Sequence, residues 1–296
     1  MLDGKEGLLL GRRRRISHST YLLSQRIGVS TWSFRNYFPS TQSQDYHGPD
    51  DTFALLDFPE MIADRYKIHH LEFVAPHFAS TNPVYLDELR NKLIRAHSYL
   101  VNLPIDIKEV STGGGLSDPS MSVRDAAVQA SMKWIDIAAH LRARSVRCDP
   151  GKMNPQNLAP TVDSYKRLVA YARRKGVRVI VENHGGVGSE HPGDLIKVFK
   201  SVNSTYFGAL PDFGNFPDAK TRARGLALLL PYAAVICHAK GLEFDAHGNE
   251  IKYDFPACIE IAKRERFRGV YSVEFEGPGD PYGGVQHVIN ELLRYV

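Results

Sequence analysis

Four segments in the second half of the chain share one pattern, in which a short, mostly apolar run ends at a polar residue. The runs 179–181, 206–211, 233–237 and 269–273 lead to Glu182, Asp212, His238 and Glu274. Apolar and β-branched runs of this length are typical of buried strands in a parallel sheet. A carboxylate at the end of such a strand is costly to bury unless a cation meets it. The pattern therefore predicts an α/β fold whose polar strand ends share a partner.

Strand-like and helix-like segments alternate eight times after the first 26 residues. Earlier strands are predicted at 27–34, 70–74, 104–110 and 145–148, with helices at 83–101, 118–143 and 161–175 among those between strands. Eight alternations over roughly 270 residues predict a (β/α)8 TIM barrel forming a single domain over residues 27–296. A doubly wound open sheet usually carries a glycine-rich turn after its first strand, and Trp32-Ser33-Phe34-Arg35 occupies that place here.

Composition excludes several classes of protein. Hydrophobic residues make up 43% and charged residues 24% of the chain, which is enough for a sizeable core. The four arginines at positions 12–15 account for the whole net charge of +4, so no general nucleic-acid-binding surface is expected. Cys148, Cys237 and Cys258 are widely separated and predict neither disulfides nor a cysteine zinc site, as in a protein of the reducing cytoplasm.

No apolar run reaches the ~18 residues that a membrane-spanning helix needs. Residues 1–26 are predicted to form a poorly ordered basic tail. Their arginines resemble the start of an export signal, but Ser17, His18, Ser19 and Thr20 interrupt any apolar segment behind them. A start codon assigned too early would produce the same pattern.

The four polar strand ends predict one divalent metal site. Successive members are 30, 26 and 36 residues apart, about the length of one βα unit. The carboxyl ends of barrel strands meet at one mouth, where catalytic residues of such barrels lie. Three carboxylates and one imidazole suit Mn²⁺ or Mg²⁺, with Co²⁺, Zn²⁺ or Fe²⁺ as alternatives. For any one of them alone, a salt-bridged or capping residue is the simpler interpretation.

Several motifs around these residues give the chain a resemblance to a known family. They are Val181-Glu182-Asn183-His184-Gly185-Gly186, Pro211-Asp212-Phe213-Gly214-Asn215, Cys237-His238-Ala239-Lys240-Gly241, Ser272-Val273-Glu274-Phe275-Glu276-Gly277 and Gly279-Asp280-Pro281-Tyr282. In this order the chain resembles, from Ile27 onward, the xylose isomerase-like barrel superfamily and its sugar phosphate isomerase/epimerase branch. The resemblance implies metal ligation by Glu182, Asp212, His238 and Glu274, and proton exchange with a substrate carbon by the two glutamates.

That reaction agrees with the residue types. A divalent ion stabilises the enediolate that forms when a proton leaves the carbon next to a carbonyl, and a carboxylate on each face removes and returns the proton. The predicted function is a metal-dependent isomerase or epimerase acting on a small carbohydrate or keto-sugar. Neither a nucleic-acid nor a membrane partner is expected, and assembly into a homo-oligomer is left open.

Substrate contacts are predicted at six further residues. Each of these residues could instead have a purely structural role, as a loop-capping histidine, a solvated lysine, part of a salt bridge at the barrel mouth or part of the core. His184 and Lys240 lie two residues beyond Glu182 and His238, on the same side of their strands. The set comprises His184, Asn215, Lys240, Trp32, His77 and Arg147.

The chain departs from the ketose epimerases at three positions. Asn215 stands where they carry a histidine, and Gly188 and Phe244 stand where they carry acidic and arginine residues. These differences disfavour epimerisation of free ketoses. A 3-keto-glycoside lyase or hydrolase of the same fold is an alternative. An endonuclease IV-like phosphodiesterase is a further alternative, but it would need additional histidines for its metal cluster. A barrel that binds a sugar without catalysis is also disfavoured, because it would not need the four polar strand ends.

Overall fold

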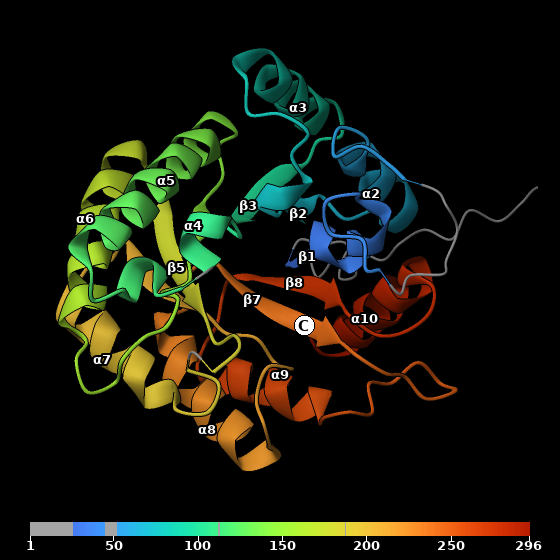
Figure 1. Cartoon of the computed structure of the whole chain (residues 1–296). Coiled ribbons are helices and arrows are strands. Elements are labelled where there is room, and N and C mark those ends of the chain that lie inside the picture. Colours follow the sequence, from blue (N-terminus) through green and yellow to red (C-terminus); the bar gives the residue numbers. More distant parts are fainter. Residues whose placement is uncertain (1–25, 45–51, 112, 187) are drawn as a thin grey trace, which may run out of the picture.

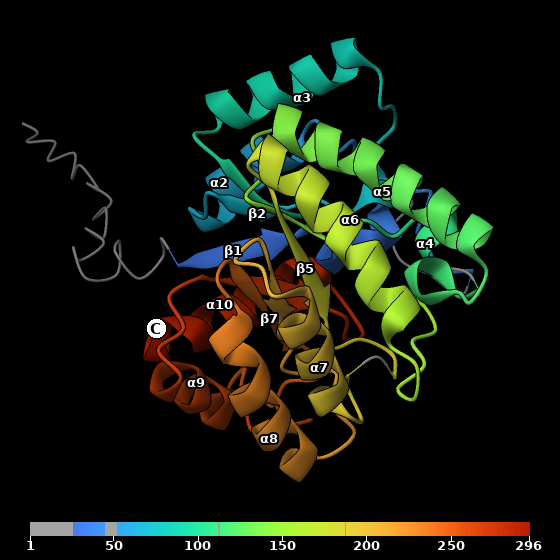
Figure 2. The same cartoon turned by 90° about the vertical axis from the view of Figure 1, so that its left-hand side faces the viewer.

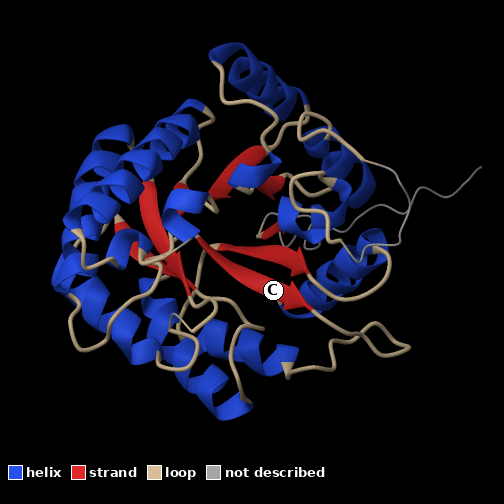
Figure 3. Ribbon diagram, in the orientation of Figure 1, coloured by secondary structure: helices blue, strands red, loops and turns tan. Residues whose placement is uncertain are grey.

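A computed structural model describes residues 26–44, 52–111, 113–186 and 188–296 of the chain. Strands gather at the centre and helices surround them (Figures 1 and 3). The predicted basic tail lies outside the described residues except for Arg26. Within the described residues no helix is long and apolar enough to cross a membrane.

The strands of this part of the chain are β1 Ile27–Ser30, β2 His70–Glu72, β3 Tyr99–Pro104, β4 Ser145–Arg147, β5 Arg178–Glu182, β6 Phe207–Leu210, β7 Ile236–Gly241 and β8 Val270–Phe275. The α-helices are α2 Phe58–Tyr66, α3 Pro83–Arg95, α4 Lys108–Ser111, α5 Met121–His140, α6 Ala159–Lys175, α7 Pro192–Val202, α8 Ala219–Leu229, α9 Phe255–Arg264 and α10 Pro281–Tyr295. Short 3-10 helices are η1 Thr31–Tyr37, η2 Ala75–His77, η3 Gly115–Ser117 and η4 Leu230–Tyr232. Figure 2 shows α5 and α6 side by side on the outside of the sheet, with α6 packing on β5.

All strand pairs in the sheet are parallel, in the order β6-β5-β4-β3-β2-β1-β8-β7. The two outer strands meet just beyond β6, where Asp212 and His238 form a parallel bridge. His238 N donates to Pro211 O at 2.9 Å, and Phe213 N donates to His238 O at 3.2 Å. The predicted (β/α)8 barrel is therefore confirmed, and the bridge between its outer strands lies at two of the predicted metal-binding residues.

Capping residues begin and end several helices where the sequence indicates. The Asn82 side chain accepts a hydrogen bond from Tyr85 N at 2.8 Å at the start of α3, and Gly176 ends α6 with φ of 74°. Asp57, which the sequence also suggests as a cap, makes no capping hydrogen bond at the start of α2.

The predicted bounds between residues 83 and 110 are wrong. The sequence predicts a helix over 83–101 and a strand over 104–110, but α3 ends at Arg95 and β3 already begins at Tyr99. His97 adopts φ of 52°, a left-handed conformation that ends the helix. Part of the segment expected to be a strand forms the short helix α4 instead.

The barrel has an apolar interior layer of its own. Ile236 belongs to a small buried cluster with Val101, Ile180, Leu210, Val235 and Val270, all contributed by or next to strands. Cys237 belongs instead to the large core cluster that includes the helices. This separation confirms the expected alternation along β7, in which Ile236 points inward and Cys237 outward. His238, the next residue, then points inward toward the mouth of the barrel.

Candidate metal centre

The four polar strand ends meet in space. Glu182 ends β5, Asp212 follows β6, and His238 and Glu274 lie within β7 and β8. All four side chains are buried, and each offers one ligand atom within 4.8 Å of the others. Successive parallel strands therefore place three carboxylates and one imidazole at the carboxyl-terminal end of the barrel, a set that could hold a metal ion.

The imidazole of His238 lies at the middle of this cluster. Its Nδ1 is 3.1 Å from Glu182 Oε1, 3.4 Å from Glu274 Oε2 and 3.5 Å from Asp212 Oδ2. Burial lowers the pKa of His238, but the charges of Glu274, Glu72 and Glu182 outweigh burial and raise it well above its usual value. A cation bound here would replace the proton on Nδ1.

The other nitrogen of His238 has a partner that holds the ring in place. His238 Nε2 is 3.0 Å from Glu72 Oε2, at the end of β2. Glu72 also accepts hydrogen bonds from Asn102 Nδ2 at 2.7 Å and Ser272 Oγ at 2.8 Å. Burial alone would raise the pKa of Glu72, but His238 and these two donors outweigh burial, so the pKa is lowered below its usual value. A histidine that binds a metal through one nitrogen usually donates from the other to such a carboxylate.

Backbone hydrogen bonds fix the orientation of Asp212. Its Oδ1 accepts from Gly214 N at 2.7 Å and Asn215 N at 2.8 Å, and its own N–H donates to Asn183 Oδ1 at 2.7 Å. Among the described residues, its buried Oδ2 has no hydrogen-bond partner. Two cationic groups lie close to it, Lys240 Nζ at 3.3 Å and His238 Nδ1 at 3.5 Å, so a bound divalent cation could satisfy this oxygen more fully.

Glu182 is held as an anion by three neighbours. Arg147 forms a salt bridge with its Oε2, Asn215 Nδ2 donates to its Oε1 at 3.1 Å, and His238 contacts the same oxygen. Burial raises the pKa of Glu182, but the charges of Arg147 and His238 hold it well below its usual range. Arg147 is itself paired with Asp106 and lies 3.5 Å from Asp149.

Lys240 completes the cluster on the side of β8. Its Nζ is 3.0 Å from Glu274 Oε2, 3.1 Å from Glu276 Oε1 and 3.3 Å from Asp212 Oδ2. Burial raises the pKa of Glu274 to about 7 despite the opposing charges of His238 and Lys240. Trp32 Nε1 donates to Glu276 Oε1 at 2.8 Å. The buried lysine therefore partly neutralises this cluster of carboxylates.

A cavity of 360 Å³ opens beside the cluster, and both Glu182 and Glu274 line it. Four of the predicted substrate contacts are in its wall, namely Trp32, Arg147, His184 and Lys240. Asn215 and His77 are not among the lining residues, although Asn215 donates to Glu182. His77 instead stacks on Phe38 at 3.8 Å between ring centroids.

The residues present fit a divalent cation. Hard carboxylate oxygens with one imidazole nitrogen suit Mg²⁺, Mn²⁺ or Zn²⁺. The Oδ2 of Asp212, which makes no hydrogen bond among the described residues, and the close approach of three carboxylates indicate the position of a positive charge. Lys240 contacts two of these carboxylates and contributes only a single charge.

Two residues that contact the cluster were not predicted from the sequence. Glu72 was not among the predicted site residues, yet its Oε2 pairs with His238 Nε2 at 3.0 Å, and Glu276 had no assigned role. The pattern of an apolar run ending in a carboxylate did not mark Glu72, because it lies in the middle of the strand predicted at 70–74, whereas β2 ends at Glu72 after only three residues. Glu276 lies two residues beyond Glu274, as Lys240 does beyond His238, and alternation places it on the same side.

Comparison with known proteins agrees with this architecture. The family model described as xylose isomerase-like TIM barrel matches residues 62–294. A search of curated proteins found no match.

Three solved structures are similar to the chain. A xylose isomerase-like TIM barrel protein from Mycobacterium smegmatis in complex with magnesium is 15% identical, covering 94% of this chain and 98% of that one with a TM-score of 0.67. A D-tagatose 3-epimerase-like protein is 17% identical, with 91% and 97% coverage and a TM-score of 0.67. The IOLI protein with a bound zinc atom is 14% identical, with 92% and 99% coverage and a TM-score of 0.69. The chain belongs to the xylose isomerase-like TIM barrel family.

Proposed function

We propose that this protein is a divalent-metal-dependent isomerase or epimerase of a sugar or sugar derivative. One observation carries the proposal: four consecutive strands bring Glu182, Asp212, His238 and Glu274 within 4.8 Å of one another beside a cavity. We assign metal ligation to these four residues, with Mn²⁺ or Mg²⁺ as the preferred ions. The magnesium- and zinc-bound neighbours support a divalent ion, and the epimerase-like neighbour supports the reaction type.

A divalent ion at this centre would supply Lewis-acid stabilisation of the negative charge that develops when a proton leaves a carbon next to a carbonyl. Glu182 and Glu274 transfer that proton in our proposal. They come from β5 and β8, which are separated by β6 and β7, and both line the cavity. This arrangement suits removal of a proton from one face of a carbon and its return to the other.

The surrounding residues then position the reacting groups. Arg147 and Asn215 fix Glu182, and Glu72 orients His238. Lys240 lies in the cavity wall, where its ammonium group can donate to a substrate oxygen as well as to Glu276. Trp32 offers an apolar face beside the cavity, and sugars pack well on aromatic rings.

Two other reactions are alternatives to isomerisation or epimerisation. A lyase acting on a 3-keto-glycoside would begin with the same proton removal and then expel a leaving group. An endonuclease IV-like phosphodiesterase would need further metal ligands. The amide nitrogen of Asn215 donates to Glu182, an arrangement that disfavours a second metal at this position.

Exchange of substrate hydrogen with solvent deuterium tests the proposal. The full-length protein is incubated in D₂O with Mn²⁺ and a panel of ketoses, keto-acids, inososes and 3-keto-glycosides, and deuterium at carbon is followed by NMR. Glu182→Gln and Glu274→Gln are each expected to abolish exchange, whereas exposed Glu260→Gln serves as the matched control and retains it. Wild-type exchange rates in both site variants would refute the two-carboxylate mechanism.

A further inference from the structure

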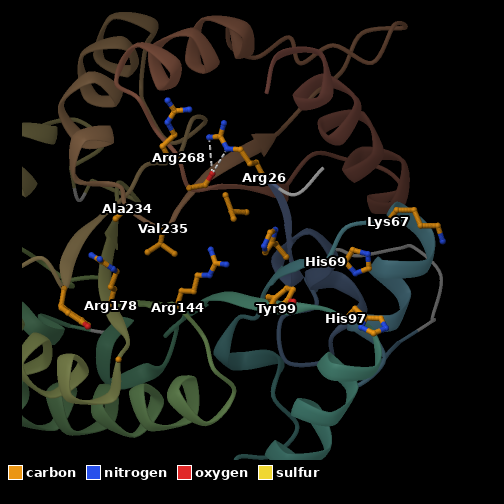
Figure 4. Close-up of a pocket in the computed structure, with 15 residues that line it drawn as sticks. Arg26, Lys67, His69, His97, Tyr99, Arg144, Arg178, Ala234, Val235 and Arg268 are labelled. Carbon is orange, nitrogen blue, oxygen red and sulfur yellow. Dashed lines mark hydrogen bonds between the residues drawn. The ribbon is translucent and has the colours of Figure 1, made fainter. Parts of the chain in front are cut away.

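A second hollow lies at the opposite end of the barrel from the candidate metal centre. It has a volume of 860 Å³ and is lined by residues at or before the amino ends of the strands. Its wall contains five basic side chains and three histidines, and none of its lining residues is an aspartate or glutamate (Figure 4). They are Arg26, Lys67, Arg144, Arg178, Arg268, His69, His70 and His97.

The strand order of the barrel explains why these arginines gather. Arg26 and Arg144 immediately precede β1 and β4, Arg178 is the first residue of β5, and Arg268 lies two residues before β8. Because the amino ends of parallel barrel strands meet at one face, residues far apart in the sequence surround one hollow. Figure 4 shows the four guanidinium groups distributed around it.

These positive charges are not neutralised by the protein. Among the described residues, none of the five basic side chains forms an ion pair with a carboxylate. Arg26 donates instead to Phe267 O at 2.9 Å and lies over the Tyr271 ring at 5.2 Å. Arg178 donates to Thr205 O and lies over the Tyr206 ring at 5.5 Å. Carbonyls and aromatic rings therefore hold two arginines in place and leave their charge available to a ligand.

The hollow is separate from the metal centre. The buried apolar cluster of the barrel interior lies between the two ends, and two of its members, Val235 and Val270, form part of the wall of the hollow. Outside the arginines at 12–15 the chain is neutral, so acidic residues elsewhere offset the basic side chains of the wall. The basic wall is thus a local concentration of charge and does not reflect a generally basic surface.

We propose that this amino-terminal hollow binds a small anion carrying several phosphate groups. Several guanidinium groups around one hollow match the oxygens of clustered phosphates, which arginine binds in a bidentate manner. A volume of 860 Å³ is in the range of small-molecule sites. Nucleic acid is a poorer match because the basic residues surround a hollow instead of following an extended groove. The 63% exposed ring of Tyr99 at the rim adds a surface on which an aromatic part of the ligand can stack.

Binding of inorganic triphosphate to the metal-free full-length protein tests this inference. Calorimetry at physiological salt is expected to give saturable binding with one site per chain. Arg144→Gln/Arg268→Gln removes two exposed arginines of the hollow and should weaken binding by roughly ten-fold or more, because charge-assisted hydrogen bonds are lost. The control Lys166→Gln/Arg224→Gln removes two exposed charges on helices α6 and α8 and should leave the affinity unchanged.

A second variant reverses the charge at one position: Arg268→Glu should abolish triphosphate binding and leave Mn²⁺ binding intact. Equal affinities of the site and control variants would overturn the inference, as would the absence of saturable binding at millimolar triphosphate. A short DNA duplex that binds more tightly than triphosphate, with the same dependence on Arg144 and Arg268, would overturn it in favour of a nucleic-acid surface. None of these outcomes depends on the isomerase proposal, because the metal centre is at the other end of the barrel.

Discussion

His77 provides a direct test of how the loops above β1 and β2 are packed. Its ring stacks on Phe38, while Nδ1 and Nε2 lie 2.8 and 2.9 Å from the hydroxyl oxygens of Thr31 and Thr41. Burial lowers the pKa of His77 from 6.5 to about 3. Because no carboxylate is among these contacts, protonating the ring in the folded protein is unfavourable.

The size of the effect follows from proton linkage. The folded pKa is lowered, so between about pH 3 and 6.5 the unfolded chain binds more protons and stability falls as the pH decreases below 6.5. For a group with these two pKa values, the free energy of unfolding decreases by about 2 kcal/mol between pH 7 and pH 5. His77→Gln keeps a polar side chain but removes the titrating group, and should lose about 2 kcal/mol less over this range.

Urea unfolding of both proteins at pH 7 and pH 5 measures the difference, because contributions from all other titrating groups cancel in the comparison. Exposed His247→Gln is the matched control and should behave as the wild type. An equal loss of stability in the wild type and His77→Gln would refute the placement of His77 as a buried neutral imidazole.

Two further predictions concern the metal centre. Glu72→Gln keeps a hydrogen-bond partner for His238 but removes the negative charge of the carboxylate. It should weaken Mn²⁺ binding, measured by calorimetry, by about 10- to 100-fold. An unchanged affinity would exclude Glu72 as the residue that orients the histidine. Lys240→Gln removes the cation between Asp212 and Glu274 and should lower the unfolding free energy of the metal-free protein by about 3–5 kcal/mol. Added Mn²⁺ should then stabilise this variant more than the wild type, and equal stabilisation by Mn²⁺ would contradict the contacts assigned to Lys240.

The barrel and its four polar strand ends could be predicted because both depend on local sequence. An apolar run ending in Glu182 or Glu274 indicates a buried strand and its end, and parallel strands must place those ends together. Asn82 and Gly176 likewise act within their own helix termini.

Contacts across the barrel could not be predicted in the same way. Glu72 meets His238 although 166 residues separate them, because strand order and the orientation of both side chains decide the pair. The helix expected over 83–101 failed because the left-handed turn at His97 carries no glycine to mark it. His77 was expected at the substrate, but its position depends on Thr31 and Thr41 from other loops. Four arginines at or just before the amino ends of strands could not be recognised as a group from the sequence, because only the barrel brings them to one face.

Mn²⁺ binding to metal-stripped full-length protein is the most direct test of the central claim that the four strand ends form a metal centre. Calorimetry should show one ion per chain in the wild type and in the control Asp218→Asn, an exposed helix cap near the site in sequence. Asp212→Asn, which replaces one oxygen of this proposed ligand and removes its charge, should lose most of that affinity. Absence of binding to the wild type, or equal binding by Asp212→Asn, would contradict the account.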